Sequence, residues 1–152
     1  MKYFNIIFFL IAVFFLSTKS FSNENWDFVK QDDWCYIKSS PVKTIIPDGK
    51  SRGVYGLIVY RINKNPELIV QITPGFNYKS ENSVIVKIDD GEHSFYTDID
   101  VAFAKNDSKV IFAMKKGLKF ETLGISSMGT EVIDTYSLKG FTAAINKLAK
   151  DC

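Results

Sequence analysis

The sequence has few of the side chains that most often carry catalytic or metal chemistry. Its 152 residues include one histidine, His93, and two cysteines, Cys35 and Cys152. A structural zinc site needs four ligands, and a Ser-His-Asp triad needs a histidine close to its serine, so we expect neither. The sequence shows no other set of residues with a catalytic spacing. We therefore expect no metal, no cofactor and no enzymatic activity.

The chain also lacks a large excess of charge of either sign. Nineteen basic and 17 acidic residues give a formal net charge of +2. Two of the basic residues, Lys2 and Lys19, lie in the N-terminal segment considered next, and without them the two numbers are equal. A nucleic-acid-binding domain usually carries a basic excess or a basic stripe. We therefore expect no nucleic-acid partner.

The longest apolar run is too short to cross a membrane. It covers residues 6–16 (IIFFLIAVFFL), follows Lys2 and ends before Ser17-Thr18-Lys19, whereas a spanning helix needs about 20 apolar residues. A basic start, a short apolar run and the small residues Ser20 and Ser22 are typical of a cleaved signal peptide. We expect cleavage between Ser22 and Asn23, with residues 1–22 as signal peptide and 23–152 as a single domain. The mature chain would then have no transmembrane span and be periplasmic or secreted; the alternative is an uncleaved membrane anchor.

Export would place Cys35 and Cys152 in an oxidising compartment, where an even number of cysteines favours disulfides. A bond between them would close a loop of more than 100 residues, which the chain-entropy model values at roughly 4–5 kcal/mol. An intermolecular bridge and a reactive pair are the alternatives. Redox-active pairs usually lie close in sequence, so an intramolecular structural disulfide is the preferred interpretation.

Most of the remaining chain has the pattern of antiparallel strands. Apolar and β-branched runs alternate with turn signals such as Asn-Pro, Pro-Gly and Asp-Gly, and two pairs of runs are spaced as hairpins. Residues 23–30 are expected to be a polar lead-in and residues 45–52 a loop; the apolar pattern of residues 95–103 does not resolve into one element. The expected strands are residues 34–37, 53–62, 67–73, 82–88, 92–96 and 118–125.

Two segments favour helices. Residues 107–116 have a capping residue at Asp107 or Ser108 and a glycine, Gly117, where a left-handed cap would stand; a strand is the alternative because Val-Ile-Phe is β-prone. Apolar residues also recur at helical spacing from near Ser137, the expected N-cap, to Leu148. The fold class expected is α+β, mainly an antiparallel β-sheet or sandwich with one or two packed helices, including a C-terminal helix.

A series of short motifs also follows one another in a characteristic order. The most specific are Ala113-Met114-Lys115-Lys116-Gly117 and Thr135-Tyr136-Ser137-Leu138-x-Gly140-Phe141-x-x-Ala144, which precedes the final Cys152. Earlier motifs are Trp34-Cys35, Ser40-Pro41-Val42-Lys43, Arg52-Gly53, Pro74-Gly75-Phe76-Asn77-Tyr78 and Ile88-Asp89-Asp90-Gly91. This order resembles the invasion-associated locus B family of exported alphaproteobacterial proteins. The resemblance implies a small envelope or secreted protein, and it supplies no catalytic residues.

A few residues are candidates for contact with a partner. Arg52 could bind a carboxylate or phosphate with both arms of its guanidinium, or form an ordinary ion pair at a strand edge. Lys115 and Lys116 could contact anionic lipid or a sugar surface, or simply complement a helix dipole. Several aromatic residues could form a binding face or pack in the core: Trp26, Trp34, Tyr36, Tyr55, Tyr60 and Phe76.

These observations favour a non-enzymatic interaction protein of the envelope or of the secreted fraction. Its partner would be a protein or another envelope component, which the sequence does not identify. The alternative is a periplasmic binding module that holds a lipid or another small apolar ligand between sheet and helix.

Overall fold

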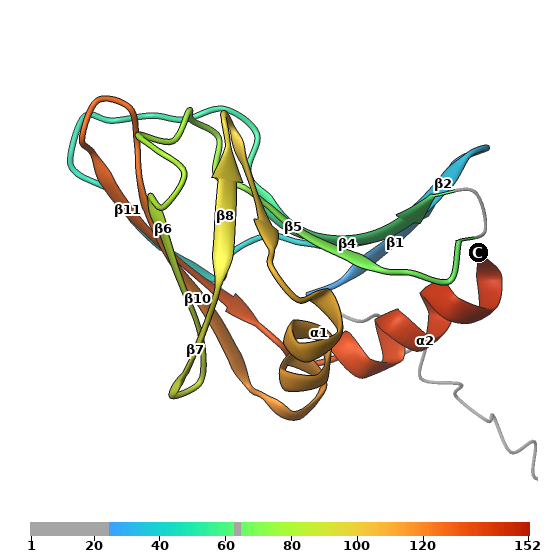
Figure 1. Cartoon of the computed structure of the whole chain (residues 1–152). Helices are drawn as coiled ribbons and strands as arrows, with labels where there is room; N and C mark the ends of the chain where they lie inside the picture. The colour runs from blue at the N-terminus through green and yellow to red at the C-terminus, as the bar shows by residue number, and fades with distance from the viewer. Residues whose placement is uncertain (1–24, 63–64) are drawn as a thin grey trace, which may run out of the picture.

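The computed structural model describes residues 25–62 and 65–152. In this part of the chain, two antiparallel β-sheets face each other and two helices pack against them (Figure 1). This is the α+β, sandwich-like architecture predicted from the sequence. The predicted signal peptide, residues 1–22, and its cleavage point lie outside the described residues. Neither helix is long and apolar enough to cross a membrane, within the residues that the structure describes.

The first sheet has six strands, all paired with antiparallel neighbours. The predicted hairpin of residues 53–62 and 67–73 forms its centre, with Gly56 paired to Thr73 and Tyr60 to Ile69. The polar lead-in was a wrong prediction, because it contains a strand and the buried Trp26. In spatial order the strands are β1 (Asp27–Lys30), β2 (Trp34–Ser39), β4 (Gly56–Ile62), β5 (Ile69–Thr73), β9 (Val101–Ala104) and β8 (Phe95–Asp98).

The second sheet has five antiparallel strands. Its two longest strands pair over their whole length, from Lys119 with Ser137 to Ile125 with Glu131. The strand of residues 131–137 and the short strand at 43–45 were not predicted. In spatial order the strands are β3 (Lys43–Ile45), β11 (Glu131–Ser137), β10 (Lys119–Ile125), β6 (Val84–Ile88) and β7 (Gly91–His93).

The Asp-Gly hairpin forms, but its returning strand is shorter than predicted. Ile88 pairs with Gly91, so Asp89 and Asp90 make the turn, and Asp89 has a left-handed φ of 50°. The strand then ends at His93, and β8 begins at Phe95 in the other sheet. The alternating pattern continues through this crossing because Phe95 is buried on the inner side of its new sheet. A strand over residues 92–96 was therefore wrong, and residues 95–104 form a hairpin of β8 and β9.

Residues 107–116 form a helix, α1 (Asp107–Lys116), rather than the alternative strand. Its N-cap is Asn106, whose side chain accepts a hydrogen bond from the Lys109 amide at 2.9 Å. The predicted cap Asp107 instead accepts from the Val70 amide of β5 at 2.7 Å. The left-handed cap at Gly117 was also wrong, since its φ is −83°. Glycine is needed there for space, because a Cβ would lie 2.8 Å from the Ile88 side chain.

The C-terminal helix, α2 (Phe141–Asp151), begins later than predicted. Ser137 is the last residue of β11, and Gly140, with φ of 85°, stands at the N-cap. Ser137 is held by other contacts, because its carbonyl accepts from the Trp26 indole at 3.1 Å. The buried face of α2 packs against β1 and β2, with Phe141 against Trp26 at 4.9 Å between ring centroids.

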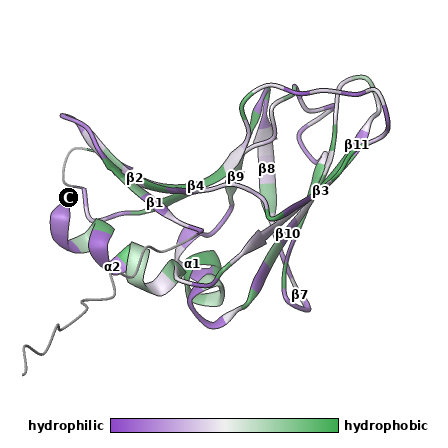
Figure 2. Cartoon of the chain, turned by 180° about the vertical axis from the view of Figure 1, so that it is seen from behind, coloured by the Kyte–Doolittle hydropathy of each residue, from purple (hydrophilic) through white to green (hydrophobic). Residues whose placement is uncertain are grey.

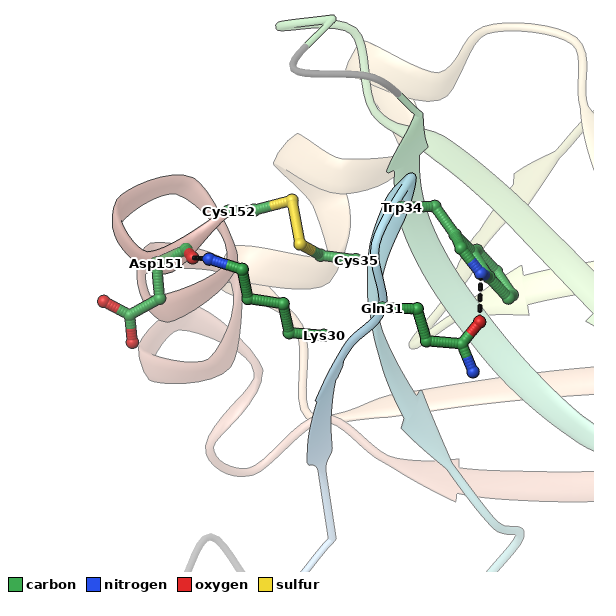
Figure 3. The surroundings of a disulfide bond; sticks show 6 residues. All are labelled: Lys30, Gln31, Trp34, Cys35, Asp151 and Cys152. Carbon is green, nitrogen blue, oxygen red and sulfur yellow. Dashed lines mark hydrogen bonds between the residues drawn. A yellow bond between two sulfur atoms is a disulfide. The ribbon is translucent and has the colours of Figure 1, made fainter.

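The predicted disulfide joins Cys35, near the start of β2, to Cys152, directly after α2. The two Cα atoms are 5.9 Å apart, within the usual range for a bridged pair. Beside it, the Lys30 ammonium donates to the carbonyl of Asp151 at 2.8 Å (Figure 3). The bond and this contact fix the end of α2 against the first sheet.

Candidate interaction site

The side of the first sheet that faces away from the helices carries an unusual set of side chains. Strand residues alternate between the two sides of a sheet, and in β2 Cys35 and Ile37 are buried on the inner side. Figure 3 shows Trp34 and Cys35 pointing to opposite sides of β2. The aromatic and isoleucine side chains among the outward residues form what we call the aromatic face: Trp34, Tyr36, Ile58, Tyr60, Ile62, Ile69, Tyr96 and Phe103.

The strand register brings these residues together across the sheet. Tyr36 pairs with Tyr60, which pairs with Ile69. Phe103 pairs with Tyr96 at a centroid distance of 5.7 Å. These cross-strand pairs are the units that stabilise a sheet surface. Between these two groups, the outward position of β5 that pairs with Phe103 is Gln71, so a polar residue separates the rings of β2 and β4 from those of β9 and β8.

Trp34 is the centre of the most compact ring cluster on this face. Its ring stacks on Tyr36 at 4.6 Å and meets the edge of Tyr60 at 5.8 Å. The indole N–H donates to the side-chain oxygen of Gln31, which fixes the ring plane (Figure 3). Burial raises the pKa of Tyr60, and the nearby charges of Asp107 and Tyr96 raise it further, so this phenol stays neutral at ordinary pH.

No described element covers the aromatic face. Both helices lie on the other side of the sheet in the two opposite views (Figures 1 and 2). Ile62 and Tyr96 at its borders are 46% and 45% exposed, while the residues between them shield one another. The solvated face of an antiparallel sheet is normally polar, and a contiguous exposed apolar patch usually marks a binding surface.

The outer face of the second sheet provides a contrast. One of its cross-strand rows is apolar and joins Ile45, Ile133, Leu123 and Ile85. The neighbouring row is charged and polar: Lys43, Thr135, Glu121, Lys87 and Glu92. That face therefore has the mixed character of an ordinary solvated sheet. The outer side of the first sheet also has polar positions, Lys38, Gln71 and Asp98, but it differs in its cluster of aromatic rings.

Arg52 lies in a buried ion pair at the end of the sandwich. Its guanidinium meets both carboxylate oxygens of Asp134 on β11, each at 2.6 Å, and also donates to the carbonyl of Pro74 at 3.1 Å. The hydroxyl of Thr44 on β3 donates a further hydrogen bond to the Asp134 carboxylate, at 2.6 Å. The Tyr55 ring lies 3.7 Å from the guanidinium carbon. The two charged side chains are 5% and 4% exposed, so Arg52 uses its guanidinium within the molecule.

This environment changes the titration of the groups around the ion pair. Burial lowers the pKa of Arg52, but the hydrogen bond and the charge of Asp134 outweigh it, and the net shift is upward. Burial followed by the charge of Asp134 also raises the pKa of Tyr78 and of Tyr136. The Tyr136 hydroxyl is buried and has no hydrogen-bond partner within the described residues. Both phenols are therefore neutral at physiological pH.

A pocket of about 260 Å³ adjoins Arg52 between the loops that follow β3, β5 and β10. Its apolar wall consists of Ile46, Phe76, Met128 and Val132, and its polar groups are those of Asn77, Ser126, Ser127 and Thr130, with Lys50 and Ser51 completing the lining. This volume is slightly below the usual range for a ligand pocket, whose lower limit is about 300 Å³. It is the place where a small apolar molecule with one polar end would fit.

The other predicted contacts lie elsewhere. Lys115 and Lys116 are exposed at the end of α1, which lies at the opposite end of the sandwich from the loop of residues 46–55 (Figure 1). The structure thus does not bring them together with Arg52, and their contact with a partner stays a prediction. Among the described residues no group of histidine, cysteine, aspartate or glutamate could hold a metal ion. His93 is half-buried, and burial, then the charge of Lys109, lowers its pKa.

Three of the six aromatic residues that the sequence left open between a binding face and the core lie together: Trp34, Tyr36 and Tyr60. Trp26 packs in the core, Tyr55 lies on Arg52, and Phe76 meets Tyr78 at 5.6 Å in a loop. The isoleucines of the face and the pair Tyr96–Phe103 were missed. The sequence does show alternation along residues 58–62 and 101–103. This alternation predicts strands, but it does not tell which side of each strand is exposed.

Fold and site together define a two-sheet α+β domain with a disulfide between its first sheet and its last helix and with one exposed aromatic sheet face. The family model described as "Invasion associated locus B (IalB) protein" matches residues 42–149, and the chain belongs to this family. The crystal structure of invasion associated protein B from Bartonella henselae is similar over 80% of this chain and 95% of that chain, with a TM-score of 0.52 and 17% sequence identity. That likeness shows a shared fold. No curated protein matches the sequence.

Proposed function

We propose that the chain is an exported, non-enzymatic protein that binds a protein partner through the aromatic face, in the periplasm or outside the cell. The exposed aromatic face carries this proposal. Tyrosine, tryptophan and phenylalanine are enriched in the centres of protein interfaces, where charged residues are depleted. On this face the outward charged positions are Lys38 of β2 and Asp98 of β8, with Asp27 on the edge strand β1.

Export is supported by two observations of different kind. Residues 1–22 have the composition of a signal peptide, and the Cys35–Cys152 disulfide is of the kind that persists in oxidising compartments. Intact-mass measurement of the protein from its own envelope and medium fractions tests this directly. We expect a chain that begins at Asn23 and gains two hydrogens on reduction; an uncleaved or already reduced chain would contradict export.

The binding proposal is best tested with a photo-reactive amino acid placed on the aromatic face. Substitution at Tyr60 puts the reactive group in the centre of the face, and substitution at Met128, which is 80% exposed in a loop, provides the control. We expect position 60, but not position 128, to give one recurrent covalent product with a protein identified by mass spectrometry. Equal products from both positions, or none from position 60, would contradict the proposal.

A matched pair of double variants then measures the affinity for the protein so identified. Tyr36→Ser with Tyr60→Ser removes two central rings, and hot-spot rings of this kind contribute at least about 2 kcal/mol each. We expect the dissociation constant to rise by roughly 30-fold or more per ring. Ile99→Ser with Met128→Ser removes apolar side chains that are 71% and 80% exposed in loops. The affinity of this control should not change.

The pocket beside Arg52 favours a second candidate, a binding module for a small apolar ligand. Its volume of about 260 Å³ and its walls of Ile46, Phe76 and Met128 support it. Native mass spectrometry of the purified protein should then show a reproducible added mass. Val132→Trp, which fills the pocket from β11, should abolish that mass, whereas a ligand-free protein would exclude this candidate.

A further inference from the structure

The outward side of α1 combines lysines with an exposed ring. Val110 and Met114 are buried against the domain, which turns the opposite side of the helix to solvent. That side carries Lys109, Phe112 and Lys116. The Phe112 ring is 60% exposed, and the Lys116 ammonium lies 4.0 Å from its centroid.

The chain directly after α1 adds a second exposed apolar side chain. The Leu118 side chain is 80% exposed. The backbone here is nevertheless fixed, because the amides of Leu118 and Lys119 donate hydrogen bonds to the Asp89 carboxylate at 3.0–3.2 Å. Leu118 is therefore held outside the core on an ordered segment. Beside Phe112, a groove of about 450 Å³ lies between α1 and residues 66–68, and the half-buried Leu68 and the buried Ile111 are among the side chains that line it.

The charge of this segment is almost entirely positive. Residues 105–119 contain five lysines and one acidic residue, Asp107, whose carboxylate points to the Val70 amide. Nearby acidic groups are partly engaged, because Asp89 binds the two amides and Glu121 pairs with Lys119 at 3.5 Å. Glu67, at the rim of the groove, is the acidic side chain next to Lys115 there.

We propose that this end of the domain binds the surface of a bilayer that contains anionic phospholipid, with Phe112 and Leu118 in the interface and the lysines at the headgroups. Surface-binding helices have this composition, with lysines on one region and phenylalanine or leucine inserted at the headgroup boundary. An acidic protein surface would attract the lysines equally well. It would not favour two separate apolar side chains held out in solvent, and for this reason the bilayer is the better partner.

Vesicle flotation of the disulfide-bonded chain tests the proposal. We expect the chain to float with mixed vesicles of phosphatidylglycerol and phosphatidylcholine at low ionic strength, to float less at high ionic strength, and to remain in solution with phosphatidylcholine alone. Each lysine near an anionic surface contributes a roughly fivefold partition, so Lys115→Ala with Lys116→Ala should weaken binding about 30-fold.

Lys50→Ala with Lys79→Ala is the matched control, because both lysines are exposed and lie in loops away from α1. It removes the same charge and should leave vesicle binding within about twofold of the unmodified chain. An equal loss in both double variants would show that net charge alone is responsible, and would overturn the proposal. Tyr36→Ser with Tyr60→Ser should also bind vesicles normally, which separates this surface from the aromatic face.

Phe112→Trp reports on insertion. Its added fluorescence should shift to the blue on phosphatidylglycerol-containing vesicles and not on phosphatidylcholine vesicles. The absence of a shift, or the absence of flotation at low ionic strength, would overturn the proposal. The proposal would also be overturned if the chain does not bind vesicles but does bind an acidic protein, and if Lys115→Ala with Lys116→Ala abolishes that protein binding.

Discussion

The hydroxyl of Tyr136 is buried between the two sheets without a hydrogen-bond partner among the described residues. An unsatisfied buried polar group costs about 1–3 kcal/mol, and the ring that carries it is fully buried against Phe120. The ring therefore contributes packing while its hydroxyl opposes folding. Such a residue is detected only when its surroundings are known, because the sequence shows an ordinary tyrosine.

Tyr136→Phe should increase stability, and the gain should grow in alkali. Burial raises the pKa of Tyr136 above its ordinary value of 10.0 in the folded state. In the unfolded chain the phenol loses its proton near pH 10, whereas in the folded chain it stays neutral to higher pH. The free energy of unfolding of the original protein is therefore unaffected by this ionisation below about pH 10 and falls as pH rises from there toward the folded pKa. We expect the free energy of unfolding to rise by about 1 kcal/mol at neutral pH and by more above pH 10.

Urea unfolding of both proteins across the pH range measures this effect. Tyr55→Phe is the control, because Tyr55 is 42% exposed and its hydroxyl can be hydrated. A Tyr136→Phe protein that is less stable than the original at neutral pH would show that the hydroxyl has a favourable partner, such as a buried water.

The sequence identified Arg52 as either a partner contact or an ion-pair member, and the structure places it in an ion pair. It could not identify Asp134 as the other member, because the two are 82 residues apart. The same limit applies to the aromatic face. Trp34, Tyr36 and Tyr60 are visible as aromatic residues, but their position on the outer side depends on which side the helices cover.

At the scale of elements, the Arg52–Asp134 pair joins β11, β3 and the loop after β3. Asp134 sits in the middle of β11, and Thr44 of β3 and the carbonyl of Pro74 complete the network. Removing one member of a buried pair leaves the other charge buried and unpaired, which costs about 3–5 kcal/mol. Replacing both with apolar residues is often much less harmful.

Arg52→Ala should therefore lower the free energy of unfolding by about 3–5 kcal/mol, and Arg52→Met with Asp134→Leu should recover most of the loss. Denaturant titration gives both values. Lys119→Ala is the control, since its ion pair with Glu121 is half-exposed and should contribute less than about 1 kcal/mol. If the double variant is no more stable than Arg52→Ala, the side chains act through packing rather than through their charges.

This pair also explains which elements could be predicted. The helices and the β4–β5 hairpin follow from local periodicity and turn residues, and all were predicted. β11 was missed because a buried aspartate interrupts its apolar alternation, and that aspartate is tolerated only because Arg52 meets it. β1 and β3 are edge strands of four and three residues, too short for a pattern, and their pairing depends on strands far along the chain.

At the scale of the whole molecule, the disulfide closes nearly all of the described chain, with a sequence separation of 117. Closing so long a loop restricts the unfolded chain and contributes about 4–5 kcal/mol in the chain-entropy model. Since either cysteine alone forms no bond, Cys35→Ser, Cys152→Ser and the double variant should lose similar amounts. Thermal unfolding of the three variants, with the reduced original chain as reference, measures this. Additive losses would show that the cysteines act separately.

The same bond determines how the molecule responds to tension. β1 and Trp34 precede Cys35, and the rest of the domain, from Cys35 in β2 to α2, lies between the two bonded residues. When the chain is pulled between residue 25 and residue 152, the covalent bond bears the load that would otherwise reach the sandwich. The segment that can be drawn out is the one before Cys35, which contains Trp26, β1 with its four pairs to β2, and Trp34 with its pairing to Ile62. The rest of the domain, including the lysines of α1, stays folded under load, but the aromatic face loses Trp34 from its ring cluster.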